Sequence, residues 1–191
     1  MAKVVLKNVR LSFPAIWKPE QYMGQGEPRY KASFLFEPTS DSAKAVNAAI
    51  MEAAKEAYGD KAKMVLDAIK GSPKEFPLSK GDLKDYEGYA GMLVLSSANK
   101  MRPDIRDRDK TPLTQQDGRP YAGCYVNAVV DIWAQVKNGK AIRCKLLGIQ
   151  FVRDGDAFSG GERAKDDDFE DLGDGADAPD LGSADDISDL V

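Results

Sequence analysis

The stretch that decides the fold is residues 121–152, YAGCYVNAVVDIWAQVKNGKAIRCKLLGIQFV. Two runs rich in β-branched and apolar residues flank Asn138-Gly139 there. This dipeptide predicts a two-residue type I′ hairpin turn, because both central residues of that turn need positive φ. The hairpin closed by this turn sets Trp133 opposite Cys144, Val130 opposite Leu147 and Val126 opposite Phe151.

This register gives the hairpin one apolar face and one mixed face, because side chains alternate along a strand. The predicted core face consists of Val126, Ala128, Val130, Ile132, Leu147, Ile149 and Phe151. The predicted outer face consists of Asn127, Asp131, Trp133, Gln135, Ile142, Cys144 and Gln150. A bulge in either strand would shift this register.

Three further strands are expected upstream, over residues 3–13, 29–37 and 90–98. In the first, Val5, Val9, Leu11 and Phe13 are expected on one face. In the second, Tyr30, Ala32, Phe34 and Phe36 face the core, opposite Arg29, Lys31 and Ser33. Residues 14–28 hold Pro14 and Pro19 without a clear period, and they are expected to form a loop.

A helical insertion interrupts the strands at about residues 40–70, where apolar residues recur at helical spacing and alanine is abundant. Residues 99–120 show no usable period and carry six cations, which predicts a long basic loop. The result is a mainly β fold with a helical insertion (α+β). Five such strands are typical of a small barrel or a sandwich.

Charge is distributed unevenly along the chain. The formal net charge is −4 over 191 residues, but residues 1–160 hold 25 Lys+Arg against 19 Asp+Glu. Residues 161–191 hold 2 Lys+Arg against 12 Asp+Glu. A basic body with an acidic tail favours a polyanionic partner. We expect a folded domain over residues 1–158 and a disordered acidic tail over 159–191, because the tail composition cannot bury a core.

Composition excludes several kinds of function. The chain has no histidine, which excludes a Ser-His-Asp triad and histidine-dependent zinc sites. Its two cysteines, Cys124 and Cys144, lie in apolar runs and are expected to be small core residues in a reducing cytosol. No apolar window reaches the length of about 18 residues that a membrane span needs. We expect no cofactor, no metal and no membrane.

Cations with interspersed aromatic residues suit sequence-neutral binding of single-stranded nucleic acid, in which phosphates meet positive charge and bases stack on rings. The candidate aromatic residues are Trp17, Tyr22, Tyr121 and Trp133. The candidate cations are Arg29, Lys31, Lys100, Arg102, Arg106, Arg108, Lys110 and Arg119. We expect no catalytic residue, so the protein is not expected to be an enzyme.

Two alternatives belong to other classes of protein. A metal-dependent nuclease would need paired carboxylates, for which Asp104, Asp107, Asp109 and Asp131 are the candidates. A non-catalytic adaptor would use the basic loop to bind an acidic protein.

Three segments resemble a bacteriophage family of single-stranded DNA-binding proteins. They are residues 123–134 (GCYVNAVVDIWA), residues 142–155 (IRCKLLGIQFVRDG) and residues 100–103 (KMRP). The resemblance covers roughly residues 3–160. It implies an OB-fold-like five-stranded barrel, an acidic C-terminal tail, a role in phage replication or recombination, and a location in the host cell cytoplasm. It implies single-stranded DNA as the partner and leaves the oligomeric state open.

The tail has a predicted role of its own. Its acidic groups are expected to compete with DNA for the basic groove, and its end is expected to dock phage or host replication proteins. The candidate residues for these contacts are Asp185, Asp186, Ile187, Asp189, Leu190 and Val191. A solubility tail without contacts is the simpler alternative.

Overall fold

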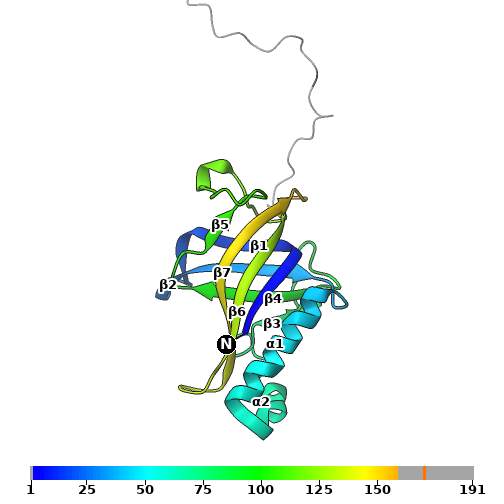
Figure 1. The fold of residues 1–191 in the computed structure, drawn as a ribbon, viewed down its shortest axis with the longest axis vertical. Coiled ribbons are helices and arrows are strands. Elements are labelled where there is room, and N and C mark those ends of the chain that lie inside the picture. Colours follow the sequence, from blue (N-terminus) through cyan, green and yellow to red (C-terminus); the bar gives the residue numbers. More distant parts are fainter. Residues whose placement is uncertain (1, 159–169, 171–191) are drawn as a thin grey trace, which may run out of the picture. The chain divides into compact units, whose positions relative to one another are not determined.

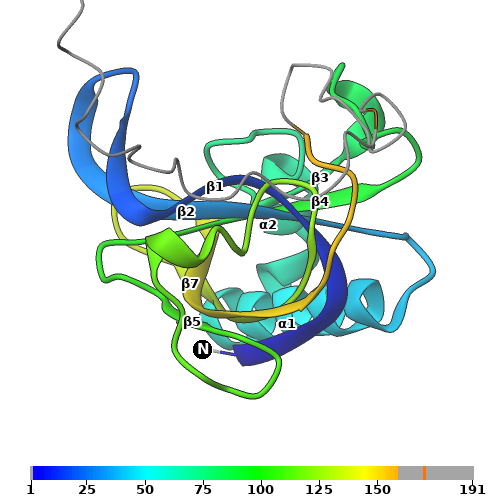
Figure 2. The same cartoon turned by 90° about the horizontal axis from the view of Figure 1, so that it is seen from above.

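The computed structural model describes residues 2–158 and residue 170. In this part of the chain seven strands form one sheet that closes on itself (Figures 1 and 2). The strands are β1 (Ala2–Tyr22), β2 (Gln25–Phe36), β3 (Leu78–Lys80), β4 (Leu93–Asn99), β5 (Asp104–Arg106), β6 (Tyr125–Gln135) and β7 (Ala141–Arg153). The helices are α1 (Asp41–Tyr58) and α2 (Ala62–Ile69).

Five of these strands make a closed barrel. β2 pairs with β1 and β4, β6 pairs with β1 and β7, and a parallel contact of β4 with β7 completes the ring. In that last contact Ala98 pairs with Lys145. The predicted mainly β, OB-fold-like barrel with a helical insertion is therefore confirmed. The short strands β3 and β5 extend the sheet at β4 and β7.

The register of the β6–β7 hairpin differs from the predicted one near the turn. Five residues, 136–140, connect the strands, so Trp133 lies opposite Arg143 and Val130 opposite Leu146. A bulge between Val129 and Val130 then restores the predicted pairing of Val126 with Phe151. Asn138 and Gly139 do have positive φ, at 58° and 99°, but within a longer loop than the predicted turn.

The correction changes which residues of β7 are buried. Ile142 and Cys144, predicted on the outer face, are buried, and so is Leu146. Leu147, predicted in the core, is only half-buried. A one-residue shift exchanges the two faces of a strand, so the bulge decides the environment of every side chain between it and the turn.

Bulges also make the burial pattern of β1 differ from the predicted one. Val4 and Leu6 are buried there, whereas Val5 is 51% and Phe13 58% exposed. The pairing of β1 with β6 shifts between Leu6 and Val9, and the pairing with β2 shifts after Ser12. The expected loop over residues 14–28 is wrong as well, because β1 and β2 continue through it as a long, irregular hairpin. Its prolines are accommodated at these register shifts, where ladder hydrogen bonds are missing.

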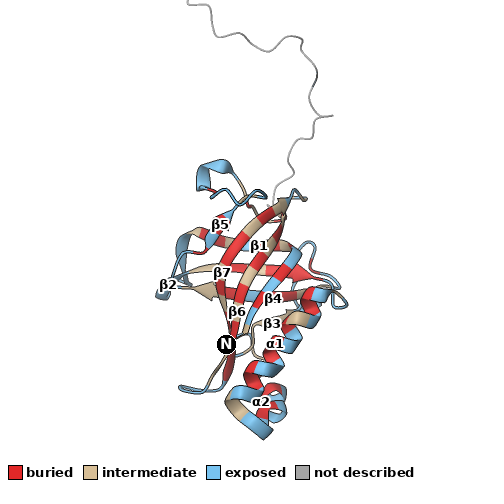
Figure 3. Ribbon diagram, in the orientation of Figure 1, coloured by how far each residue is buried: buried red, intermediate tan, exposed pale blue. Residues whose placement is uncertain are grey.

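The helices occupy the predicted position, between β2 and β4. Ser40 caps α1, since its Oγ accepts a hydrogen bond from the Ala43 N–H at 3.2 Å. Gly59 ends the helix with a φ of 56°. α1 packs against β1 and β6 through a buried face that includes Val46, Ile50 and Ala53, and Figure 3 shows this face toward the barrel. The helices therefore leave the outer face of β2 and β4 uncovered.

The segment over residues 99–120 is more ordered than its sequence predicted. It contains β5, whose Ile105 is buried and pairs with Ile149 of β7. Leu113 is also buried. Two isolated apolar residues set no detectable period, which is why the pattern predicted a loop. Within the described residues, no helix combines the length and the apolar composition needed to cross a bilayer.

The observed register can be tested by substitution of two adjacent leucines of β7. We expect Leu146→Ala to lower the free energy of unfolding by about 2–5 kcal/mol, because the side chain is fully buried. We expect Leu147→Ala, at a half-buried position, to cost about 1 kcal/mol. Chemical denaturation of both variants measures the difference, and a larger loss for Leu147→Ala would contradict this register.

Candidate functional site

A groove of about 1000 Å³ crosses the outer face of the barrel. Residues of β2, β4, β6 and β7 line it, together with residues 73–77 and the tip of the β1–β2 hairpin. Its central residues come from neighbouring positions of the sheet: Lys31 pairs with Ala98, and Ala98 pairs with Lys145. The groove therefore runs across several strands. Because the β4–β7 contact closes the barrel, the part of the groove on β2 and β4 is held in a fixed position relative to the part on β6 and β7.

Small side chains lie in the middle of the groove. Ser33 of β2 pairs with Ser96 of β4, and Ala98 follows two residues later on the same face. Small residues leave the backbone accessible, so a flat or extended ligand can approach the sheet closely. Ser97, on the opposite face, is buried and donates a hydrogen bond to the Ala32 carbonyl at 2.9 Å, which ties β4 to β2.

The charge of the groove has one sign. Of the described residues that line it, none is acidic. Six are basic, namely Arg29, Lys31, Lys74, Lys100, Arg143 and Lys145. Cations gathered in a concave surface raise the local concentration of anions, and they suit a chain of phosphates better than a single small anion.

Aromatic rings stand among these cations. Tyr22, at the hairpin tip, is 67% exposed, and the Lys31 ammonium lies 6.0 Å from its ring centroid. Trp133 is half-buried on the outer face of β6, and Phe76 lies in the 73–77 segment. Exposed rings beside cations are the two elements that stacking of bases and neutralisation of phosphates require.

Arg143 is held in place by two acceptors. Its Nε donates to the Gln135 side-chain oxygen at 3.1 Å, and its Nη1 donates to the Lys74 carbonyl at 2.6 Å. These bonds link the end of the β6–β7 hairpin to the 73–77 segment across one end of the groove. The guanidinium is thus positioned before any ligand binds.

Lys100 forms an ion pair with Glu27, which is not a groove residue. The hydrogen bond and charge of Lys100 hold the pKa of the Glu27 carboxyl below its usual value. Both side chains are largely exposed, so water screens this pair. A phosphate that binds Lys100 would replace Glu27 at little cost.

Five of the twelve predicted DNA-binding residues line the groove: Tyr22, Arg29, Lys31, Lys100 and Trp133. Two more form a pair, since the Arg102 guanidinium lies 5.3 Å from the Trp17 ring. Arg102 is two residues from Lys100, but the lining residues include neither Arg102 nor Trp17. Any stacking of a base on that face of Trp17 would have to displace Arg102.

The other five predicted residues belong to the 104–121 region and are not brought into the groove. Arg106 pairs with Asp104 at 2.8 Å, and Arg119 pairs with Asp107. The Arg119 hydrogen bond lowers the pKa of the Asp107 carboxyl, which stabilises this loop conformation. Arg108 and Lys110 form no ion pair within the described residues, and they remain candidates for a separate contact.

Tyr121 has a local structural role. Its hydroxyl donates to an Asp154 carboxylate oxygen at 2.8 Å, and the ring packs against the core. Burial raises the pKa of Tyr121. These contacts hold the end of β7. The contact of Tyr121 with DNA stays a prediction.

Sequence reasoning missed Lys74, Phe76, Arg143 and Lys145. Arg143 and Lys145 were overlooked because the assumed register gave them the parity of the core face, and the bulge moves them onto the face of Trp133. Their charge was the available signal, since Lys and Arg are rarely buried without a partner. Lys74 and Phe76 lie in an irregular segment, where no period places a side chain.

The cysteines are buried and free, as predicted. Burial raises the pKa of the Cys124 thiol to about 11 and that of Cys144 further still, so both are protonated at neutral pH. Among the described residues, no three Cys, Asp or Glu side chains gather as a metal would need. The predicted tail residues, from Asp185 to Val191, lie outside the described part of the chain.

Comparisons with known proteins agree with this geometry. A family model described as the ssDNA-binding protein of Enterobacter phage Enc34 matches residues 2–180. Protein p50 of Acyrthosiphon pisum secondary endosymbiont phage 1 is 46% identical over 172 residues, which are 89% of this chain and 94% of that protein.

Solved structures give the same result. The single-stranded DNA-binding protein from bacteriophage Enc34, in complex with ssDNA, superposes with a TM-score of 0.69 at 27% identity. The match covers 82% of this chain and 89% of that one. The T7 single-stranded DNA-binding protein gp2.5 has a TM-score of 0.52 at 15% identity over 92% and 100% of the two chains, a likeness of fold alone. The chain belongs to the family of the Enterobacter phage Enc34 single-stranded DNA-binding protein.

Proposed function

We propose that this phage protein binds single-stranded DNA in the groove across β2, β4, β6 and β7. The observation that carries the proposal is the composition of the groove: six cations, aromatic rings and no acidic residue among its described lining residues. The predicted class of function, a single-stranded DNA-binding protein of a phage, agrees with the family to which the chain belongs.

The binding mode follows from the arrangement of the groove. Lys31 and Lys145 lie on either side of Ala98, so they can neutralise phosphates of a strand that passes over the small residues. Tyr22 and Trp133 both line the groove and can offer their rings to bases. Stacking contributes about 1–3 kcal/mol per base and accepts every base, so the rings of the groove are not expected to select among bases.

This function needs no catalysis. A family of DNA-binding proteins supplies no support for the nuclease alternative. Asp131 lies opposite Lys145 in the β6–β7 pairing, and the other three candidate carboxylates have partners in their own loop. Asp104 and Asp107 are paired with arginines, and the Asp109 carboxylate accepts a hydrogen bond from the Thr111 N–H at 2.9 Å. We therefore assign these residues a structural role. The adaptor alternative would use the same cations and is separated by the binding experiments below.

We further propose that the acidic tail competes with DNA for the groove. The charge of residues 161–191 is opposite to that of the six groove cations. The last barrel strand ends at Arg153, and the described chain continues to Phe158. Phe158 and Phe13 line one pocket, and Phe13 also lines the groove. A chain spans up to about 3.5 Å per residue, so 31 residues can reach any part of this face.

We also propose that the tail contacts phage or host replication proteins. The protein would act in the host cell cytoplasm. Asp185, Asp186 and Asp189 supply charge near the C-terminus, and Ile187, Leu190 and Val191 supply apolar anchors. A segment that binds either its own groove or a partner would be released for the partner when DNA fills the groove.

The first prediction for DNA binding concerns the dependence of affinity on salt concentration. Counterion release gives log affinity a slope against log salt concentration of about −0.7 for each phosphate neutralised on a single strand. If all six cations neutralise a phosphate, the slope should be about −4, and with fewer contacts it should be shallower. We expect Lys145→Ala to make the slope shallower by about 0.7. Fluorescence anisotropy of labelled oligo-dT over a salt series measures both values.

Lys63→Ala is the matched control, since it removes an exposed cation of α2 outside the groove. We expect it to leave the slope unchanged. A slope that responds to Arg108→Ala and ignores Lys145→Ala would place the DNA on the 104–119 loop, and no binding of oligo-dT would favour the adaptor alternative.

The second prediction concerns stacking on Trp133. Trp133→Leu keeps an apolar side chain but loses the ring, and we expect affinity for oligo-dT to fall by about 1–3 kcal/mol. The chain has two tryptophans, so quenching of tryptophan fluorescence by oligo-dT should be mostly lost in Trp133→Leu and mostly kept in Trp17→Leu. Equal loss in both variants would show that the groove does not distinguish these rings.

The third prediction concerns the tail. A chain that ends at residue 160 should bind oligo-dT more tightly than the full chain at low salt, because it lacks the competing acidic groups. The difference should shrink as salt is raised, since screening weakens the competition. A full chain with asparagine at Asp185, Asp186 and Asp189 separates charge from length, and unchanged affinity in both forms would refute the competition.

A further inference from the structure

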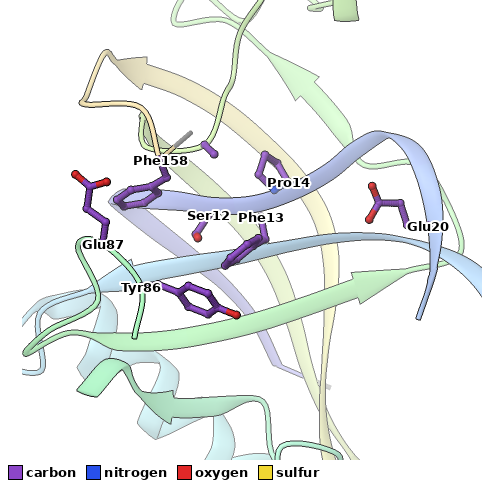
Figure 4. Close-up of a pocket in the computed structure, with 8 residues that line it drawn as sticks. Ser12, Phe13, Pro14, Glu20, Tyr86, Glu87 and Phe158 are labelled. Atoms are coloured by element: carbon purple, nitrogen blue, oxygen red, sulfur yellow. The ribbon is translucent and has the colours of Figure 1, made fainter. Parts of the chain in front are cut away.

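A second pocket of about 350 Å³ lies beside β1 (Figure 4). Phe13, Tyr86 and Phe158 surround it, and Glu20 and Glu87 lie at opposite sides of the view. Its volume is at the lower end of the range for small-ligand sites and is large enough for one nucleobase with part of its sugar. The binding function assigned to the groove does not use this pocket.

The pocket presents exposed rings on a fixed support. Phe13 is 58% and Tyr86 52% exposed, and their ring centroids are 5.0 Å apart in an edge-to-face arrangement. Tyr89 lies behind them, 5.2 Å from Tyr86, and is almost completely buried. Its hydroxyl shares a hydrogen bond of 2.7 Å with Ser12 Oγ, which fixes this aromatic cluster to β1.

The backbone of Phe13 is strained in order to expose its ring. The residue has a φ of 46°, in the left-handed region that bulky residues rarely occupy. This conformation coincides with the register shift that follows Ser12. Strain that turns an apolar ring out of the core into water does not favour stability, and such conformations cluster at binding sites.

The charged residues of the pocket lining are acidic, whereas those of the groove are basic. The described lining residues of the pocket include two glutamates and no lysine or arginine. Arg10 lies next to this lining, since its guanidinium carbon is 4.0 Å from the Phe158 ring centroid, and it donates hydrogen bonds to the Gly123 and Asp156 carbonyls. The carboxylates would repel a phosphate, but they accept hydrogen bonds from the exocyclic amino groups of bases, as in the contact of Glu with cytosine N4. Rings and acceptors together therefore suit a base rather than the DNA backbone.

Phe13 connects this pocket to the groove, because it lines both. We propose, on the basis of the DNA-binding function above, that the pocket receives one unstacked base of the bound strand and favours cytosine over thymine through Glu20 and Glu87. The base stacks on Phe13 or Tyr86, while its amino group donates to a carboxylate. The phosphates on either side remain with the cations of the groove.

The test compares oligo-dC with oligo-dT of equal length at pH 8, by anisotropy with the full chain. We expect dC to bind at least about fivefold more tightly, the lower limit for one good base contact. Glu20→Gln combined with Glu87→Gln should bring the ratio close to one, since an amide no longer selects for a donor. Glu52→Gln, on the exposed surface of α1, is the matched control and should keep the wild-type ratio.

A second readout locates the base. Oligonucleotides with 5-iodocytosine should crosslink to the tryptic peptide 85–100, which contains Tyr86, and Tyr86→Ala should abolish that crosslink. Equal affinities of the wild type for dC and dT, or a preference that survives both Glu→Gln changes, would overturn the pocket assignment. Failure to bind either oligonucleotide would instead contradict the proposed function, so the two failures are distinguishable.

Discussion

The bulge between Val129 and Val130 is the constraint on which the functional face depends. Between the bulge and the turn, Leu146 and Cys144 are buried in the core. Arg143 and Lys145 face outward beside Trp133. A regular hairpin would bury the cations or expose the apolar residues. One unpaired residue thus allows β7 to close the barrel and to supply two of the groove cations.

Charged residues are distributed unevenly over the described surface. In the groove, the described lining residues include cations and no acidic residue, although Lys100 pairs with the exposed Glu27 beside the groove. The 104–119 loop instead neutralises Arg106 and Arg119 internally. The described lining residues of the pocket at Phe13 include two glutamates and no lysine or arginine. Phosphates are therefore expected to follow the groove, and bases are expected to turn toward rings. The number of cations in a segment is a poor guide to binding, because paired cations are already satisfied.

The sequence predicted the class of fold, the position of the helices and the basic outer face of β2. It predicted these because alternation and helical spacing persist over many residues in regular elements. It did not predict the bulges in β1 and β7, since a bulge has no periodic signal. Phe13 was consequently expected in the core, and Lys145 was not considered for the site.

We place the bound DNA on the outer face of β2, β4 and β7. Amide chemical-shift mapping of the full chain with oligo-dT tests this placement most directly, because each residue reports separately. DNA on this face should cause the largest changes around Lys31, Ala98 and Lys145, which pair across these strands. Changes confined to residues 104–119, with that row unperturbed, would contradict this placement.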